Sequence, residues 1–176
     1  IVRASSAARG RMIETLSEVR AHGGVQGVYR HASAVTHTDV IFSVFVPGGA
    51  RGAMPVLWYL SGLTCTHANV TEKGEFRAAC AEAGVIFVAT DTSPRGEEVP
   101  DDPDGLWDFG QGAGFYVDAT EAPWDRHFNM WSYVANELPA LVAEHFPADI
   151  KRQSITGHSM GGHGALTLAL GLPGRF

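Results

Sequence analysis

The sequence GHSMG, residues 157–161, has the spacing of a hydrolase nucleophile, because Ser159 has a glycine two residues before it and another two residues after it. A serine on a sharp turn has a crowded, strained backbone, and glycines remove the β-carbons that would clash there. The free N–H groups of a helix that begins at this turn favour the negative charge of a developing oxyanion. The pattern therefore predicts Ser159 as a nucleophile and the backbone N–H of Met160 as one oxyanion donor.

The flanking segments decide whether Ser159 is a nucleophile or an incidental serine in a glycine-rich turn. SITG, residues 154–157, predicts a short strand, and GGHGALTLAL, residues 161–170, predicts a helix. Other short apolar runs predict three further strands, at residues 40–46, 55–60 and 85–90. The helix-forming sequence GEFRAACAEAG, residues 74–84, lies between the last two of these runs. A strand, a helix and a strand in this order predict a parallel sheet, so we expect an α/β fold.

One more helix is predicted between the long central loop and the strand before Ser159. In the segment 129–146, apolar residues recur near helical spacing, among them Trp131, Val134 and Leu138. Pro139 lies inside this pattern and lacks a backbone N–H, so we expect it to kink or interrupt the helix.

Composition and charge narrow the classes of partner. The chain of 176 residues is 45% hydrophobic and has a formal net charge of -6 with no basic run, which argues against a nucleic-acid interface or an anionic membrane patch. No run of about 18 apolar residues occurs that would span a membrane. Cys65 and Cys80 have neither the close pairing of a redox motif nor the density of a disulfide scaffold, so a reducing, cytoplasmic compartment is expected. Whether copies of the chain form a homo-oligomer stays open.

Several long motifs, in one order, resemble those of the S-formylglutathione hydrolase (esterase D) family. They are LSGLTC at 60–65, DTSPRGEEVPDD at 91–102, DFGQGAGFYVDAT at 108–120, NELPAL at 136–141 and GHSMGGHGAL at 157–166. The resemblance covers residues 24–176. It implies an α/β-hydrolase fold and a serine thioesterase that hydrolyses S-formylglutathione to formate and glutathione, the last step of formaldehyde detoxification.

Carried over by position, the resemblance implies that Ser159 is the nucleophile and that the N–H groups of Met160 and Leu63 form the oxyanion hole. The chemistry of the motifs supports these assignments, because Leu63 lies in the loop that follows a predicted buried strand. The resemblance also implies that Cys65 is a thiol near the site and not the nucleophile. From its position alone a reactive thiolate stays open, although no basic partner is evident nearby.

The segment 91–120 is expected to form an ordered loop over the site, because long irregular segments in small domains are usually functional. Its aromatic residues and one beyond it are candidates for lining a substrate pocket, although aromatic residues in such loops also anchor the loop to the core. These candidates are Trp107, Phe115, Tyr116 and Trp124.

Other patterns in the chain predict no metal and no cofactor. The glycines of 110–114 neither follow a predicted strand nor open a helix, as a dinucleotide site requires. The aspartates of 101–104 resemble half a calcium loop without its distal glutamate and are interpreted as a solvated acidic turn. His158 and His163 lack the spacing of zinc ligands and are interpreted as structural.

The triad of an α/β-hydrolase has the order serine, acid, histidine, but only 17 residues follow Ser159. We therefore expect that the triad acid and histidine are not in this chain, which would be the N-terminal portion of the fold without its C-terminal strands and helices. The expected organisation is an N-terminal extension at 1–23, whose first residues have the composition of a transit peptide, and a partial α/β-hydrolase domain at 24–176. The alternatives are a general carboxylesterase or acyltransferase, and a catalytically incomplete fragment or non-catalytic binding module.

Overall fold

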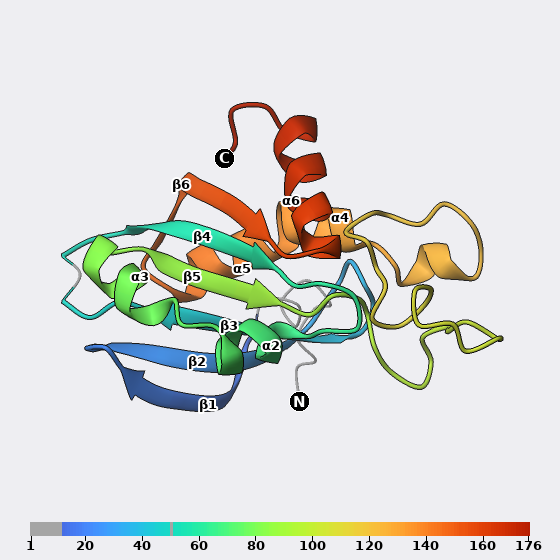
Figure 1. Cartoon of the computed structure of the whole chain (residues 1–176), viewed down its shortest axis with the longest axis horizontal. Coiled ribbons are helices and arrows are strands. Elements are labelled where there is room, and N and C mark those ends of the chain that lie inside the picture. The colour runs from blue at the N-terminus through green and yellow to red at the C-terminus, as the bar shows by residue number, and fades with distance from the viewer. Residues whose placement is uncertain (1–11, 50) are drawn as a thin grey trace, which may run out of the picture.

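Three of the predicted strands form the middle of a six-stranded sheet, whose order is β1-β2-β3-β5-β4-β6 (Figure 1). They are β3 (Asp39–Val46), β4 (Met54–Leu60) and β5 (Ile86–Thr90). The structure is a computed structural model, and it describes residues 12–49 and 51–176. All five residues of β5 are buried. Strands covered on both faces have continuous apolar runs, which explains why this strand could be predicted.

The half of the sheet that leads to Ser159 is parallel, as predicted. β4 pairs in parallel with β5 on one side and with β6 (Ala148–Gly157) on the other. Two helices, α2 (His67–Lys73) and α3 (Arg77–Ala83), connect β4 to β5. β6 begins six residues earlier than the predicted strand at 154–157. Because the three strands run in one direction, their carboxyl ends lie at one edge, beside the loop of residues 91–129 (Figure 1).

The other half of the sheet is antiparallel, and its first two strands were not predicted. β1 (Glu14–Ala21) pairs with β2 (Gly24–Ala32), and β2 pairs with β3. His22 and Gly23 join β1 to β2, both with positive φ, 46° and 76°, as the two-residue turn of a tight hairpin requires. β1 lies within the expected extension at 1–23, so part of that segment is a strand of the sheet. The residues whose composition loosely resembles a transit peptide are 1–11, which lie outside the described residues.

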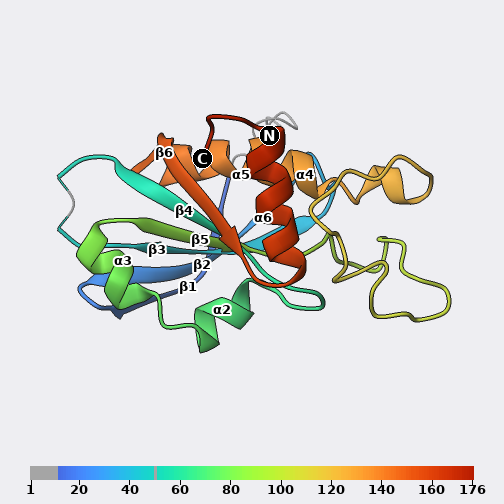
Figure 2. The ribbon, with the colours of Figure 1, turned by 45° about the horizontal axis from the view of Figure 1, so that its top comes forward.

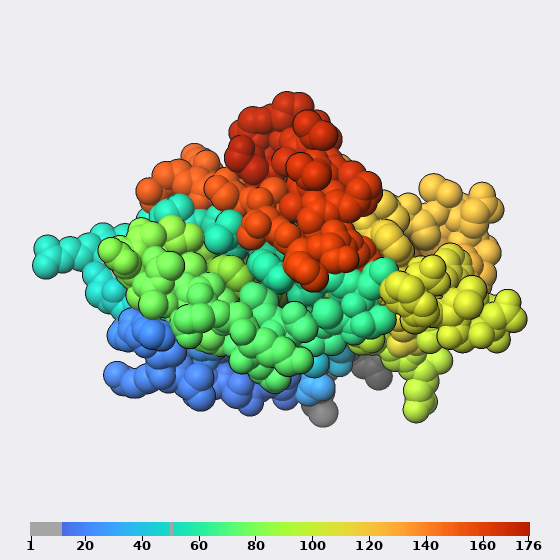
Figure 3. All heavy atoms as spheres, in the orientation of Figure 1, coloured from blue at the N-terminus to red at the C-terminus, as the bar shows by residue number. Residues whose placement is uncertain are grey.

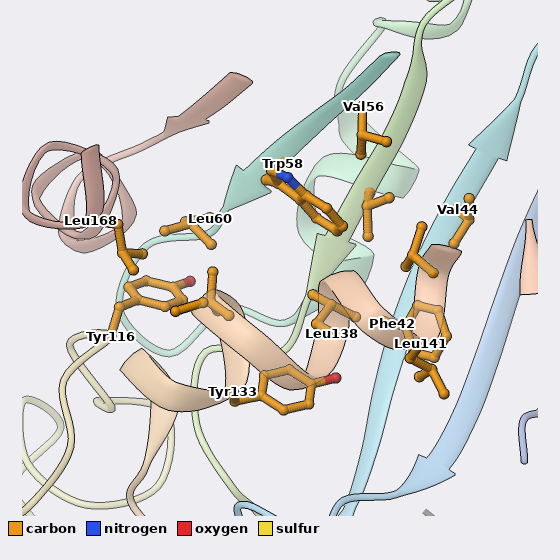
Figure 4. Packing of buried hydrophobic residues seen from close by; sticks show 14 of the residues in the cluster. Phe42, Val44, Val56, Trp58, Leu60, Tyr116, Tyr133, Leu138, Leu141 and Leu168 are labelled. Atoms are coloured by element: carbon orange, nitrogen blue, oxygen red, sulfur yellow. The ribbon is translucent and has the colours of Figure 1, made fainter. Parts of the chain in front are cut away.

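Helices cover both faces of the sheet (Figures 1 and 2). On one face Val70 of α2 and Cys80 of α3 pack with Phe45 and Phe87 of the sheet. The larger core lies on the other face, beneath α5 (Leu138–His145) and α6 (Met160–Gly171). In Figure 4, Leu60 of β4 lies next to Leu168 of α6 and Tyr116 of the long loop. This core therefore joins the helix after Ser159 to the loop that precedes it.

The predicted helix at 129–146 continues through Pro139. It consists of α4 (Met130–Ser132), a π-helical segment (Tyr133–Glu137) and α5, so the expected interruption takes the form of a change in hydrogen-bond spacing. The change places Pro139 in the first turn of α5, where its missing N–H costs little. The carbonyl of Ala135, four residues before the proline, accepts a hydrogen bond from the Arg175 guanidinium.

Glu137, at the end of the π-helical segment, ties this helix to the turn between β2 and β3. Its carboxylate accepts hydrogen bonds from the backbone N–H of Ala34, at 2.7 Å, and from the hydroxyl of Ser33. Ser33 is itself buried and also accepts from the N–H of Thr36 at 3.0 Å. One carboxylate therefore satisfies polar groups of a turn that lies about 100 residues away in the sequence.

We expect Glu137→Ala to lower the free energy of unfolding by about 1–3 kcal/mol, because it leaves the Ser33 and Ala34 donors without their acceptor. Urea denaturation of the protein measures this change. Glu82→Ala, at an exposed position of α3, is the matched control and should change the free energy by less than about 0.5 kcal/mol. Equal effects of the two substitutions would show that the carboxylate does not stabilise this turn.

Candidate active site

Ser159 lies at the junction of β6 and α6 in a backbone conformation that few residues other than glycine adopt. β6 ends at Gly157, α6 begins at Met160, and Ser159 between them has φ 55° and ψ -120°. Such a conformation costs about 1–3 kcal/mol and persists only where neighbouring structure enforces it. The Ser159 side chain is exposed. The strand and helix predicted on either side of Ser159 are confirmed, and the turn between them has the geometry of a nucleophile elbow.

Glycines let the end of β4 approach this elbow. A β-carbon on Gly161 would lie 1.9 Å from the carbonyl oxygen of Leu60, and one on Gly157 would lie 2.2 Å from the carbonyl of Gly161. The Leu60 carbonyl also accepts a hydrogen bond from the N–H of His158, at 3.1 Å. Backbone therefore packs directly on backbone here, and no side chain fits between β4 and the first turn of α6.

The residues after β4 form a turn that lies against Ser159. A β-carbon on Gly62 would be 3.2 Å from the β-carbon of Ser159, so the turn that contains Leu63 lies beside the serine. The turn closes through a hydrogen bond from the Cys65 N–H to the Gly62 carbonyl, at 3.2 Å. Within the described residues, neither Leu63 nor Met160 donates its N–H to a carbonyl of a loop, turn or cap. This arrangement suits an oxyanion hole made of the two predicted donors.

Tyr116 supports this turn from the core (Figure 4). Its hydroxyl donates to the carbonyl of Ser61 at 2.9 Å, and burial raises the pKa of the phenol, which keeps the donor protonated. The ring packs on α6, where a β-carbon on Gly164 would come within 2.5 Å of it. Tyr116 was expected to line a pocket, but its side chain is fully buried and joins α6 to the turn.

The other aromatic candidates lie in the loop that projects from one end of the molecule, in yellow in Figure 3. Phe115 and Trp124 line an apolar cavity of about 430 Å³, together with Phe109 and Phe128. The Trp124 ring meets the Phe109 and Phe128 rings edge to face, with centroids 4.7 and 5.5 Å apart. Trp107 does not line this cavity and is 66% exposed. Sequence analysis missed Phe109 and Phe128, although Phe109 belongs to the same DFGQGAGFYVDAT motif as Phe115.

The two cysteines lie in different environments, and both are free thiols. Cys65 is partly buried at the end of the turn beside Ser159. Cys80 lies on the buried side of α3, where burial raises the pKa of its thiol and makes a thiolate unfavourable.

The backbone N–H groups of the two histidines near the elbow, His158 and His163, donate hydrogen bonds there. The N–H of His163 donates to the Ser159 carbonyl at 3.1 Å, in the first turn of α6, and the side chains of His158 and His163 are exposed. His67, at the start of α2, is partly buried, which lowers its pKa and favours the neutral ring. In the described part of the chain no hydrogen bond joins the Ser159 hydroxyl to a histidine.

The patterns that resembled cofactor or metal sites have packing roles. Gly112 lies against Thr64, where a β-carbon would be 3.1 Å from the Thr64 α-carbon, and a β-carbon on Gly114 would be 2.5 Å from the carbonyl oxygen of Thr92, just beyond β5. The Asp101 carboxylate accepts from the N–H of Gln111 at 2.8 Å. Among residues 12–49 and 51–176, no group of three or more His, Cys, Asp or Glu side chains is placed to hold a metal ion. The helices of this same part include none with the length and hydropathy needed to cross a membrane.

The family described as "Putative esterase" matches residues 33–176, which contain the elbow, the turn at 62–65 and the long loop. The chain belongs to this esterase family. Among solved structures, an S-formylglutathione hydrolase from Agrobacterium tumefaciens is similar, with 56% sequence identity and a TM-score of 0.90 over 92% of this chain. A ferulic acid esterase shares the fold at 18% identity and a TM-score of 0.66. The α/β-hydrolase fold predicted for the chain is therefore confirmed.

Two curated relatives of the chain are S-formylglutathione hydrolases. S-formylglutathione hydrolase of Paracoccus denitrificans is 58% identical over 164 residues, and that of Mus musculus is 47% identical over 165 residues. In each comparison the match covers 93% of this chain and 58% of the relative. The solved structure from Agrobacterium tumefaciens is also covered over 58% of its length. The chain thus spans less than two thirds of the esterases that it matches.

We expect Gly161→Ala to disrupt the elbow and Gly162→Ala to leave it intact. The new methyl group at position 161 would overlap the Leu60 carbonyl, whereas at position 162 it meets the Gly157 carbonyl at an ordinary 3.4 Å. The first substitution should lower the free energy of unfolding by about 1–3 kcal/mol. The second should raise it by up to about 1 kcal/mol, because alanine favours a helix. Chemical denaturation measures both changes, and a destabilised Gly162→Ala would contradict this packing.

Proposed function

We propose that the protein containing this chain is a serine thioesterase that hydrolyses S-formylglutathione to formate and glutathione. The observation that carries this proposal is the identity of 56–58% with S-formylglutathione hydrolases from two bacteria, over more than nine tenths of the chain. The exposed serine on a strained strand-to-helix turn, next to two free N–H groups, supports acyl transfer as the reaction.

In the proposed mechanism, the Ser159 hydroxyl attacks the formyl carbonyl carbon of the thioester. The N–H groups of Leu63 and Met160 stabilise the negative charge on the carbonyl oxygen in the tetrahedral intermediate. The carbon–sulfur bond then breaks, and glutathione leaves as a thiolate that needs little assistance from an acid. Water hydrolyses the formyl ester on Ser159 and releases formate. We propose that the proton acceptor is a histidine, oriented by an acidic residue, and that both lie outside this chain.

This assignment places the protein in glutathione-dependent removal of formaldehyde. We further propose a cytoplasmic location, where glutathione is abundant and thiols such as Cys65 stay reduced. The chemistry needs neither a metal nor a cofactor, since the serine supplies the nucleophile and backbone N–H groups supply the electrostatic stabilisation.

A general carboxylesterase is the second candidate, because an exposed serine on a strand-to-helix elbow beside the turn at 62–65 suits an oxygen ester as well as a thioester. The two candidates differ in the ratio of kcat/KM for S-formylglutathione and for 4-nitrophenyl acetate. We expect the thioester to have the higher value, and a higher value for the aryl ester would favour the carboxylesterase.

We expect Ser159→Ala to abolish labelling of the complete protein by a serine-directed fluorophosphonate, because the probe phosphonylates the nucleophilic hydroxyl. Cys65→Ser should retain labelling, which mass spectrometry of the intact protein measures. Labelling that persists in the alanine variant would remove Ser159 from its role. A wild-type protein that is never labelled would instead support a non-catalytic binding module.

A further inference from the structure

The turn that carries the Leu63 N–H contains a second strained residue. Thr64, in the third position of the turn at 62–65, has φ 63°. A four-residue turn with positive φ at its third position is normally built with glycine or asparagine there. A β-branched residue such as threonine rarely adopts this conformation and does so only when its surroundings enforce it. The structure around Thr64 must therefore hold the turn in place.

Two segments of the long loop hold the turn at 62–65 in place. The Thr64 N–H donates to the carbonyl of Gly112 at 3.0 Å. On the other side, the carbonyl of Cys65 accepts hydrogen bonds from the Thr92 hydroxyl at 2.6 Å and from Nη2 of Arg95 at 3.1 Å. The peptide group before the strained α-carbon and the Cys65 carbonyl at the end of the turn are thus both bonded to residues outside the turn.

Arg95 is itself anchored at the end of β5. Its Nε lies 2.9 and 3.0 Å from the two carboxylate oxygens of Asp91, which directly follows β5 and is only 7% exposed. Arg95 therefore uses one nitrogen for the carboxylate and another for the Cys65 carbonyl. The planar guanidinium fixes the angle between these two bonds, which a lysine ammonium cannot do.

We propose that Arg95 is a positioning residue for the oxyanion hole, an inference that rests on the proposed acyl-transfer function. By holding the Cys65 carbonyl against Asp91 and β5, Arg95 keeps Thr64 in its strained conformation and the Leu63 N–H beside Ser159. Without Arg95 the turn relaxes toward a conformation with negative φ at Thr64, and the Leu63 donor loses its alignment with the oxyanion. Arg95 then acts on the transition state through the turn, without touching the substrate.

The test compares Arg95→Gln and Arg95→Lys with the wild type in the complete protein that carries this chain. Hydrolysis of 4-nitrophenyl acetate should show kcat reduced by about 10- to 100-fold, since loss of one oxyanion donor costs about 10²–10³. KM should change little, because the proposal gives Arg95 no contact with substrate. An increase in KM with unchanged kcat would assign Arg95 to substrate binding and overturn the proposal.

Arg152→Gln is the matched control. Arg152 also joins a carboxylate and a backbone carbonyl, with Nε 2.7 Å from Asp149 and Nη2 2.8 Å from the Ala53 carbonyl, at the opposite end of β6 from Ser159. Its loss removes the same kinds of hydrogen bond and should leave kcat unchanged. An equal fall in kcat for Arg152→Gln would show that the Arg95 effect is general destabilisation.

A rescue experiment isolates the strain at Thr64. Glycine adopts positive φ without cost. Thr64→Gly in the Arg95→Gln background should therefore keep the turn in place without the Arg95 hydrogen bond, and kcat should rise about fivefold or more above that of Arg95→Gln alone. No recovery in this double variant would overturn the proposal, even if one single variant folds poorly. The aryl ester also separates the two hypotheses, because wild-type protein that hydrolyses it but not S-formylglutathione contradicts only the proposed substrate.

Discussion

The close approach of the β4 backbone to the turn at Ser159 is the constraint on which the rest of the site depends. The Leu60 carbonyl lies where a β-carbon of residue 161 would be, and it bonds the N–H of His158. This contact exists only because β4 and β6 are parallel neighbours whose carboxyl ends meet in register, Leu60 opposite Gly157. The turn after β4 therefore passes beside Ser159. Sheet register therefore places the turn at 62–65 beside Ser159 before any side chain contributes.

The long loop after β5 serves this arrangement mainly as a support. Tyr116 bonds the carbonyl of Ser61, Gly112 bonds the N–H of Thr64, and Arg95 bonds the carbonyl of Cys65. These contacts come from three positions of the loop and converge on the turn at 62–65. The apolar cavity lies along the same loop, next to Phe115 and Trp124. The glycines of 110–114 allow close packing, Gly110 against Asp101, Gly112 against the turn at Thr64 and Gly114 against Thr92, just beyond β5.

A structural feature could be predicted from the sequence where the residues that form it are close together in the chain. The elbow was found because its glycines and the apolar segments beside it are adjacent in the sequence. β1 was missed because seven of its eight residues are exposed, so it shows no alternation, and the His22–Gly23 turn is a weak signal beside Asn-Gly. The buried position of Tyr116 and the contact of Arg95 with Cys65 depend on segments 30 to 55 residues apart. No local pattern encodes such contacts.

Strain at Ser159 and at Thr64 has one physical origin. Each residue has positive φ on one side of the same small space, and each is enforced by backbone contacts that a regular turn would not make. In a regular turn at either position, the N–H groups would bond carbonyls of the same turn or helix. In residues 12–49 and 51–176, the Leu63 and Met160 N–H groups at these strained turns donate to no carbonyl of a loop, turn or cap. Strained conformations that the surrounding fold holds in place are what the proposed oxyanion hole needs in order to be preorganised for an anion.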